Sequence, residues 1–234
     1  MDPVFAIALL ALLFLGSHLV ISSRAVRPRL IAIFGEDRYA GVYSIVALAT
    51  FIPLCFVFAR HKHSGAMLWD LRNVPIVRWL VWLLMLLAII ILVAGFITPN
   101  PGSMSALGEA KQASTARGVL KISRHPSFIA FSTFGLAHLL MNGFLGDVIF
   151  FGTFPALSII GGKHQDARKE AQLGAAYKSL KATTSFFPGL ALVRGRQHWT
   201  AADTPWTAIM IGVALTALIL WLHPMIFGGN PLGM

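Results

Sequence analysis

The sequence predicts an all-α fold, a polytopic helical bundle that spans a membrane, and three observations support this prediction. Hydrophobic residues make up 56% of the 234-residue chain, charged residues only 12%, and the mean hydropathy is +0.73. Soluble domains carry about twice that share of charged residues. The apolar residues fall into six runs, each close to the roughly 20 residues that a helix needs to cross the hydrocarbon layer. The charged residues lie mainly between these runs.

Each apolar run is expected to form one transmembrane helix within a single domain that covers residues 1–234. Pro126 and Pro205 suit a helix start, because proline lacks the N–H that has no helical partner there. Asn142-Gly143 is a typical helix end. Few residues separate the fourth and fifth runs, which should therefore form a tight antiparallel hairpin. The expected spans cover residues 3–22, 40–59, 76–98, 126–142, 144–162 and 205–227.

The basic residues predict the orientation of the chain. Of the 19 Lys and Arg residues, fifteen, Lys111 among them, follow the first, third and fifth spans, and four lie on the opposite side. Basic loops face the cytoplasm, so both termini are predicted outside. The first span is expected to be retained, because its basic residues follow the apolar run. We expect a multi-pass protein of the cytoplasmic membrane that contacts anionic headgroups and binds no nucleic acid.

Several classes of chemistry lack the residues they require. The nine acidic residues lie at span ends or in loops, which argues against catalysis by paired carboxylates inside the membrane. The sequence contains no phosphate-binding loop, no nucleophile elbow and no HExxH zinc motif. Cys55 is the only cysteine, so no disulfide within the chain and no cysteine-based metal site can form.

Two histidines inside apolar runs are the strongest functional candidates. His18 lies in the first span and His138 in the fourth, and an ionisable group in hydrocarbon is by default a functional hypothesis. Two imidazoles from different helices can ligate a haem iron. A hydrogen bond to a neighbouring helix, or a polar stop near the interface, is the alternative. Their depths differ by about 10 Å on ideal helices. Helix tilt or a shifted span boundary must close this gap, or the partner is another histidine, with His164 as the reserve candidate.

Three further residues complete the candidate site. Gly135 is one turn before His138 and lets a flat macrocycle or a second helix approach the backbone. His125 is thirteen residues before His138, which places the two imidazoles on nearly opposite sides of the helix, about 20 Å apart along its axis. His125 and Arg124 are therefore candidates for catalysis or anion binding at the cytoplasmic mouth, or form a polar anchor. The other histidines, His61, His63, His198 and His223, are expected to be solvated or interfacial.

Three segments together resemble the NnrU family of bacterial membrane proteins, to which the zeta-carotene isomerases of plants and cyanobacteria are related. They are His18 with SSRAVRPRL at 22–30, SRHP at 123–126 with LAHL at 136–139, and GAAY at 174–177 running to TSFFP at 184–188. The resemblance covers most of the chain and implies either a denitrification or nitric-oxide-related role, or isomerisation of a polyene.

The resemblance also implies a cofactor and its ligands. The isomerase branch binds haem b and acts on a 15-cis double bond when the iron is reduced. His18 and His138 match its axial ligands, and His125 and His164 match further histidines of the family. Gly135 stands where that branch has a cysteine linked to ligand exchange. This position therefore gives no support to a thiolate switch or to direct transfer of the isomerase activity.

The leading hypothesis is thus a haem-b-binding membrane protein that acts on a small or lipophilic substrate by redox-linked chemistry or cis-trans isomerisation. Two other classes stay open. Arg124-His125-Pro126 before a hairpin, followed by a basic helix with Glu170 and Tyr177, also resembles membrane methyltransferases of the isoprenylcysteine type, which use S-adenosylmethionine. The third class is a non-enzymatic accessory protein. Substrate, electron donor and oligomeric state are not determined by the sequence.

Overall fold

The computed structural model describes residues 1–100 and 116–231, so Lys111 lies outside the described residues. Within the described part the chain is helical, and its β-type pairing is an isolated bridge between Met67 and Phe144. The all-α prediction is therefore confirmed. By contacts the chain divides into a first unit, Met1–Val81 with Gly135–Arg168, and a second unit, Trp82–Phe134 with Lys169–Met234.

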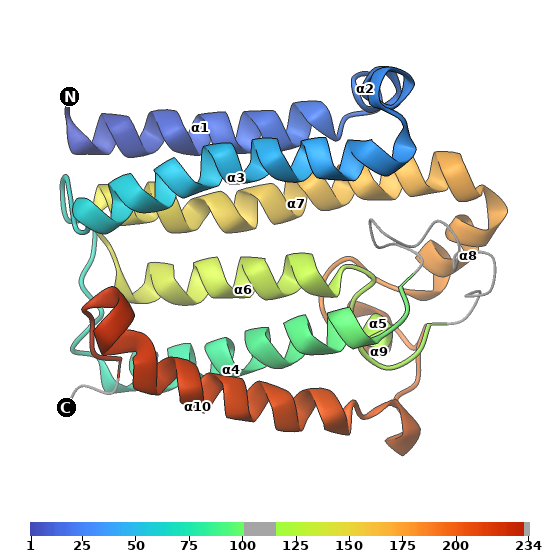
Figure 1. The fold of residues 1–234 in the computed structure, drawn as a ribbon. Helices are drawn as coiled ribbons and strands as arrows, with labels where there is room; N and C mark the ends of the chain where they lie inside the picture. Colours follow the sequence, from blue (N-terminus) through green and yellow to red (C-terminus); the bar gives the residue numbers. More distant parts are fainter. Residues whose placement is uncertain (101–115, 232–234) are drawn as a thin grey trace. The chain divides into compact units, whose positions relative to one another are not determined.

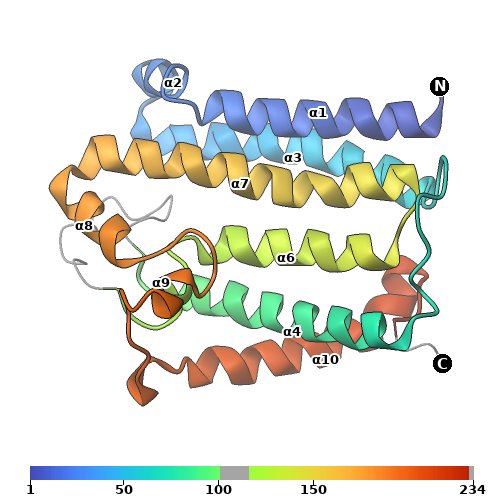
Figure 2. The same ribbon diagram turned by 180° about the vertical axis from the view of Figure 1, so that it is seen from behind.

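Apart from α7, the long helices follow the predicted spans closely (Figures 1 and 2). Within the described residues, five are long and apolar enough to cross a membrane: α1 (Pro3–Ile21), α3 (Glu36–Arg60), α4 (Pro75–Ile97), α7 (Leu145–Leu173) and α10 (Trp206–Phe227). The fourth predicted span is the shorter α6 (Pro126–Met141). The other helices in the described part of the chain are α2 (Arg27–Phe34), α5 (Val119–Ile122), α8 (Ala175–Thr183), α9 (Leu190–Val193) and the 3₁₀ turn η2 (Ala201–Asp203).

The length of α6 makes the count of six spans approximate. Its 16 residues rise about 24 Å, less than the roughly 30 Å of the hydrocarbon layer. Pro126 begins α6 as predicted, because its missing N–H needs no partner there. By contrast, α7 continues through the polar residues after the fifth predicted span, to Leu173. The polar helix expected at this place is therefore a continuation of the membrane helix.

In the first unit, α1, α3 and α7 lie side by side in both views (Figures 1 and 2). Aromatic side chains fill the space between them, with the rings of Phe58 and Phe150 stacked at 3.9 Å. Ile7 of α1 and Leu54 of α3 are completely buried. Close packing of large apolar side chains thus holds the three helices that carry or adjoin the predicted ligands.

In the second unit, small residues let the helices approach closely, as is usual in membranes. A Cβ added to Gly212 of α10 would lie 3.0 Å from the Cα of Ile90 of α4. Ala94, Val119 and Ala208 form a buried core nearby in this unit. A second cluster joins Ala116 and Leu120 to Tyr177 and Leu180 of α8. Tyr177 is 1% exposed, so it is a core residue.

Asp203 ties the segment before α10 to the start of α5. Its carboxylate accepts hydrogen bonds from Lys121 Nζ at 2.8 Å, Thr200 Oγ1 at 2.6 Å, Thr200 N at 2.9 Å and Gly118 N at 3.2 Å. Burial disfavours the charged form, but these bonds outweigh it and hold the pKa of Asp203 below its usual range. The Asp203 carboxylate is therefore part of the capping box of η2, and it does not cap α10.

Replacing Asp203 should lower stability in a pH-dependent way. Its pKa is lower in the folded chain than the roughly 3.9 of an unfolded aspartate, so its stabilising effect is present above about pH 4 and is lost as the pH falls. We expect Asp203→Asn to lower the Tm in detergent by about 5 °C at pH 7. The difference from wild type should shrink as the pH is lowered below 4.

A matched control is Asp70→Asn. The pKa of Asp70 is also lowered, to about 2, by hydrogen bonds from Arg72, but this pair is exposed. Exposed ion pairs contribute little to stability, so the Tm of this variant should stay close to wild type. A Tm of Asp203→Asn equal to that of the control would contradict the assigned role of Asp203.

Candidate functional site

The structure distributes the predicted site residues over both units. His18, Gly135, His138 and His164 belong to the first unit, and Arg124 and His125 to the second. Within the described residues, no group of three His, Cys, Asp or Glu side chains is arranged to hold a metal ion directly. A haem site needs only one or two axial side chains, so each histidine is considered by its own contacts.

His18 is held by its own helix in a form that suits metal binding. Its Nδ1 lies 2.9 Å from the carbonyl oxygen of Phe14. A carbonyl only accepts hydrogen bonds, so Nδ1 carries the proton and a neutral His18 keeps a lone pair on Nε2. Metal-binding histidines commonly have one nitrogen fixed in this way. The imidazole also packs against the rings of Phe14, at 4.2 Å, and Tyr43, at 5.3 Å.

His138 lies in the last turn of α6, against α7. Its imidazole stacks on the ring of Phe151 with centroids 4.7 Å apart and an interplanar angle of 22°. One turn earlier, a Cβ on Gly135 would lie 2.6 Å from the carbonyl oxygen of Phe151 and 2.7 Å from Cδ of Pro155. The close approach expected at Gly135 is thus an approach of α7, which leaves no room for a side chain.

An aromatic ladder connects the two histidines across the first unit. Consecutive ring centroids along it are 4.2 to 6.1 Å apart. Along the helix axes the two ends of the ladder are offset by the three residues from Phe151 to Phe154 on α7 and the four from Phe14 to His18 on α1. At the rise of an α-helix these seven residues amount to about 10 Å. From His18 to His138 the rings belong to Phe14, Phe51, Phe154, Phe150 and Phe151.

The directions of the helices reduce this offset. Within the first unit α1 runs parallel to α7, whereas the end of α6 runs antiparallel to it (Figure 1). Side chains on a helix tilt toward its N-terminus. The imidazole of His18 therefore leans toward Phe14, as its contacts show, and the imidazole of His138 is expected to lean toward Gly135. These two directions point toward each other along the bundle, which reduces the offset between the two imidazoles along the helix axes.

His164 has an unsatisfied nitrogen. Its Nδ1 is buried and has no hydrogen-bond partner among the described residues. It lies on the part of α7 that extends beyond the apolar segment. An unpaired buried nitrogen is unusual enough to need an explanation. His164 therefore keeps its place as the reserve ligand.

In the second unit, the segment with Arg124 and His125 is locked to the segment around Phe186. The backbone N–H of Arg124 donates to Ser185 O at 3.1 Å, and Ser123 Oγ donates to Phe186 O at 2.8 Å. The imidazole of His125 lies 5.2 Å from the Phe186 ring, and the Arg124 guanidinium lies 5.9 Å from it. Both side chains are buried. Two of the three sequence motifs thus meet here, which favours binding over a freely solvated anchor.

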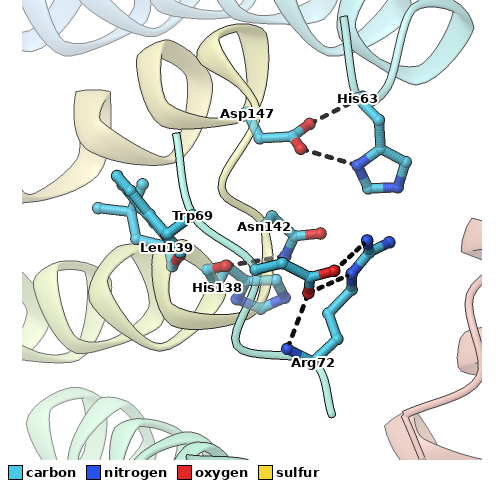
Figure 3. Close-up of polar contacts among 8 residues, drawn as sticks. His63, Trp69, Arg72, His138, Leu139, Asn142 and Asp147 are labelled. Carbon is cyan, nitrogen blue, oxygen red and sulfur yellow. Dashed lines mark hydrogen bonds and ion pairs between the residues drawn. The ribbon is translucent and has the colours of Figure 1, made fainter. Parts of the chain in front are cut away.

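The connection between α3 and α4, residues 61–74, makes a polar contact with α7 that the sequence did not indicate (Figure 3). Asp147, in the first turn of α7, is completely buried. Its two carboxylate oxygens accept from the backbone N–H of His63 at 3.0 Å and from His63 Nδ1 at 2.8 Å. His63 itself is exposed, as expected, and its contact with the buried Asp147 is the feature that the sequence did not predict. A sequence signal existed, since Asp147 follows closely on an apolar helix, but its partner is 84 residues away.

The fold and these sites define a class, a polytopic all-α membrane protein with histidines on its internal helix faces. Comparison with known families assigns it further, because the sequence model described as NnrU protein matches residues 6–231. The chain belongs to the NnrU family.

Two curated relatives are plant enzymes. The 15-cis-zeta-carotene isomerase, chloroplastic, of Arabidopsis thaliana is 26% identical over 239 residues, which covers 98% of this chain and 62% of the relative. The protein of the same name from Zea mays is 25% identical over 201 residues, covering 82% of this chain and 53% of the relative. The chain thus spans little more than half the length of these relatives. No solved structure matches the chain.

The packing at Gly135 predicts that no side chain is tolerated there. Gly135→Ala should lower the Tm in detergent by several degrees, because the new methyl group meets a backbone carbonyl that cannot move without shifting α7. Gly152→Ala in α7 is the matched control, since a Cβ there meets nothing within 4 Å. Alanine has the better helix propensity, so this variant should be neutral or slightly more stable. Equal Tm values for the two variants would show that the contact is unimportant.

The His63–Asp147 contact predicts a second stability effect. His63→Ala should destabilise the protein by about 2–4 kcal/mol, because it leaves a completely buried carboxylate short of a donor. His61→Ala is the control, since His61 is exposed and two residues away. The measurement is thermal unfolding in detergent, with Asp147→Asn in the His63→Ala background as the second arm. That double variant should recover part of the loss, because its neutral amide is less costly to bury.

Proposed function

We propose that this chain binds haem b in its first unit through His18 and His138, and that it catalyses cis-trans isomerisation of a lipophilic polyene. The observation that carries the proposal is the state of His18. Its Nδ1 is hydrogen-bonded to the Phe14 carbonyl inside an apolar helix, which leaves Nε2 as a lone-pair donor. A second imidazole, that of His138, stands at the other end of the same aromatic ladder.

The residues of the first unit are chemically suited to this group. Two neutral imidazoles are frequent axial ligands of haem iron. The aromatic rings between them offer apolar, flat surfaces that suit a porphyrin and exclude water. When bound, the haem would supply an iron centre able to change oxidation state. The protein's own contribution is to hold the two imidazoles, to fix the tautomer of His18 through Phe14, and to keep the surroundings apolar.

The substrate class is inferred from the relatives. Both plant relatives are named as isomerases of 15-cis-zeta-carotene, and a carotene is an apolar polyene. The apolar helices here would take up such a molecule from the lipid phase. Arg124 and His125, buried beside Phe186 in the second unit, are proposed to serve the reaction as polar groups that bind an anionic or polar end of a ligand.

A redox-linked role in nitric-oxide metabolism is the second candidate. One observation favours it: Gly135 is packed against α7, so this chain has no side chain where the isomerase branch is expected to have a cysteine. Under either reading we propose a bacterial inner-membrane location with contacts to anionic headgroups, in line with the basic residues that follow the first, third and fifth predicted spans.

The proposal predicts a Soret absorption band in protein purified after expression with ample haem. The spectrum should show a low-spin haem with two nitrogen ligands, and His18→Ala and His138→Ala should each abolish that signature. His223→Ala, which alters an exposed histidine hydrogen-bonded to Gly229 O, should leave it intact. Haem-free wild-type protein under these conditions would rule the proposal out.

The haem-loaded protein then allows the two candidate functions to be separated. If the protein is an isomerase, reduced protein in liposomes should convert the central cis double bond of 15-cis-zeta-carotene to the trans configuration. Haem binding without conversion would favour the redox role. Binding of S-adenosylmethionine in calorimetry, by a protein without haem, would favour the methyltransferase reading instead.

A further inference from the structure

The C-terminal end of α6 has a backbone problem that bears on His138. The last four carbonyls of any helix lack partners within the helix. In α6 these include the carbonyls of His138 and Leu139. An unsatisfied carbonyl is costly in an apolar environment. This helix ends early for a membrane helix, so other groups must satisfy its last turn.

Two side chains satisfy these carbonyls (Figure 3). Asn142 Nδ2 donates to His138 O at 2.8 Å, and Trp69 Nε1 donates to Leu139 O at 2.9 Å. The backbone N–H of Asn142 also reaches Leu139 O, but at 3.3 Å. Asn142 is a local cap, four residues from His138. Trp69 comes from the connection between α3 and α4, so its bond is a tertiary contact.

Trp69 is carried by a strap, defined here as residues 61–74, that is bonded along the turn between α6 and α7. Its backbone pairs with the turn through Leu68 N to Gly143 O at 2.8 Å and Leu145 N to Ala66 O at 2.9 Å. A Cβ on Gly143 would collide with the backbone carbonyl of Trp69. The strap is also anchored at its start by the His63–Asp147 contact.

The strap therefore holds Trp69 close to the end of α6. Its backbone is paired with the turn just before Trp69, and Gly143 approaches the Trp69 carbonyl so closely that no side chain fits at that position. The indole N–H is thus held against the carbonyl next to His138. A loss of this bond would leave the last turn of α6 with only its local cap.

We propose that Trp69 is a positioning residue for His138: its indole N–H holds the last turn of α6 in place and so sets where the His138 imidazole stands. This inference rests on the proposed function for its meaning, since His138 is proposed there as a haem ligand. The competing view is that Trp69 is an interfacial tryptophan whose ring only anchors the chain at the membrane surface.

Trp69→Phe separates the two views, because phenylalanine keeps an aromatic ring and removes only the N–H donor. In haem-free protein we expect amide hydrogen exchange in peptides covering 136–143 to become about tenfold faster, as suits the loss of one hydrogen bond. In haem-loaded protein we expect a smaller low-spin fraction and a shifted reduction potential, because His138 is held less firmly.

Trp221→Phe is the matched control, since Trp221 lies on α10 and is 68% exposed. It should leave exchange at 136–143 and the haem spectrum unchanged. Unchanged exchange in Trp69→Phe, with faster exchange only in Trp69→Ala, would overturn the inference in favour of an anchor. Faster exchange in Trp69→Phe, combined with a wild type that binds no haem, would contradict only the haem proposal. The role of Trp69 in positioning the end of α6 would still be supported.

Discussion

Every polar atom on the apolar helices of this protein needs a partner inside the protein, because hydrocarbon offers none. This constraint explains the contacts that matter most in the first unit. His18 satisfies its Nδ1 through the Phe14 carbonyl, and the end of α6 is satisfied by Asn142 and Trp69. The strap depends on the same rule, since the buried carboxylate of Asp147 is paired with His63. The arrangement of the histidines follows from these local solutions.

The constraint also shapes what the first unit can hold. The rings between His18 and His138 form one ladder from α1 through α3 to α7, an apolar environment with an imidazole at each end. Gly135 brings α7 so close to α6 that the ladder is directly continuous with His138. A side chain at that position would require a different packing of α6 and α7.

The helices were largely predictable because hydrophobic length alone specifies a membrane span. The start of α6 at Pro126 followed from local residue chemistry, whereas the extension of α7 to Leu173 lies beyond the predicted span. Tyr177 lies on a helix of polar composition and is nevertheless in a core, because such a helix can bury one face against a partner that the sequence does not reveal. The pairing of His63 with Asp147 was not predicted for the same reason, since the two residues are distant in the chain.

The sequence by itself determined the class of protein, the approximate number of spans and the presence of histidines within apolar runs. These properties depend on the composition and on patterns within short stretches of the chain. Only the tertiary structure decided which side chain satisfies which buried atom: that Trp69 reaches α6, that Asp147 pairs with His63, and that Gly135 receives α7. Such pairings depend on helix directions and on close packing between distant segments, which no local pattern encodes.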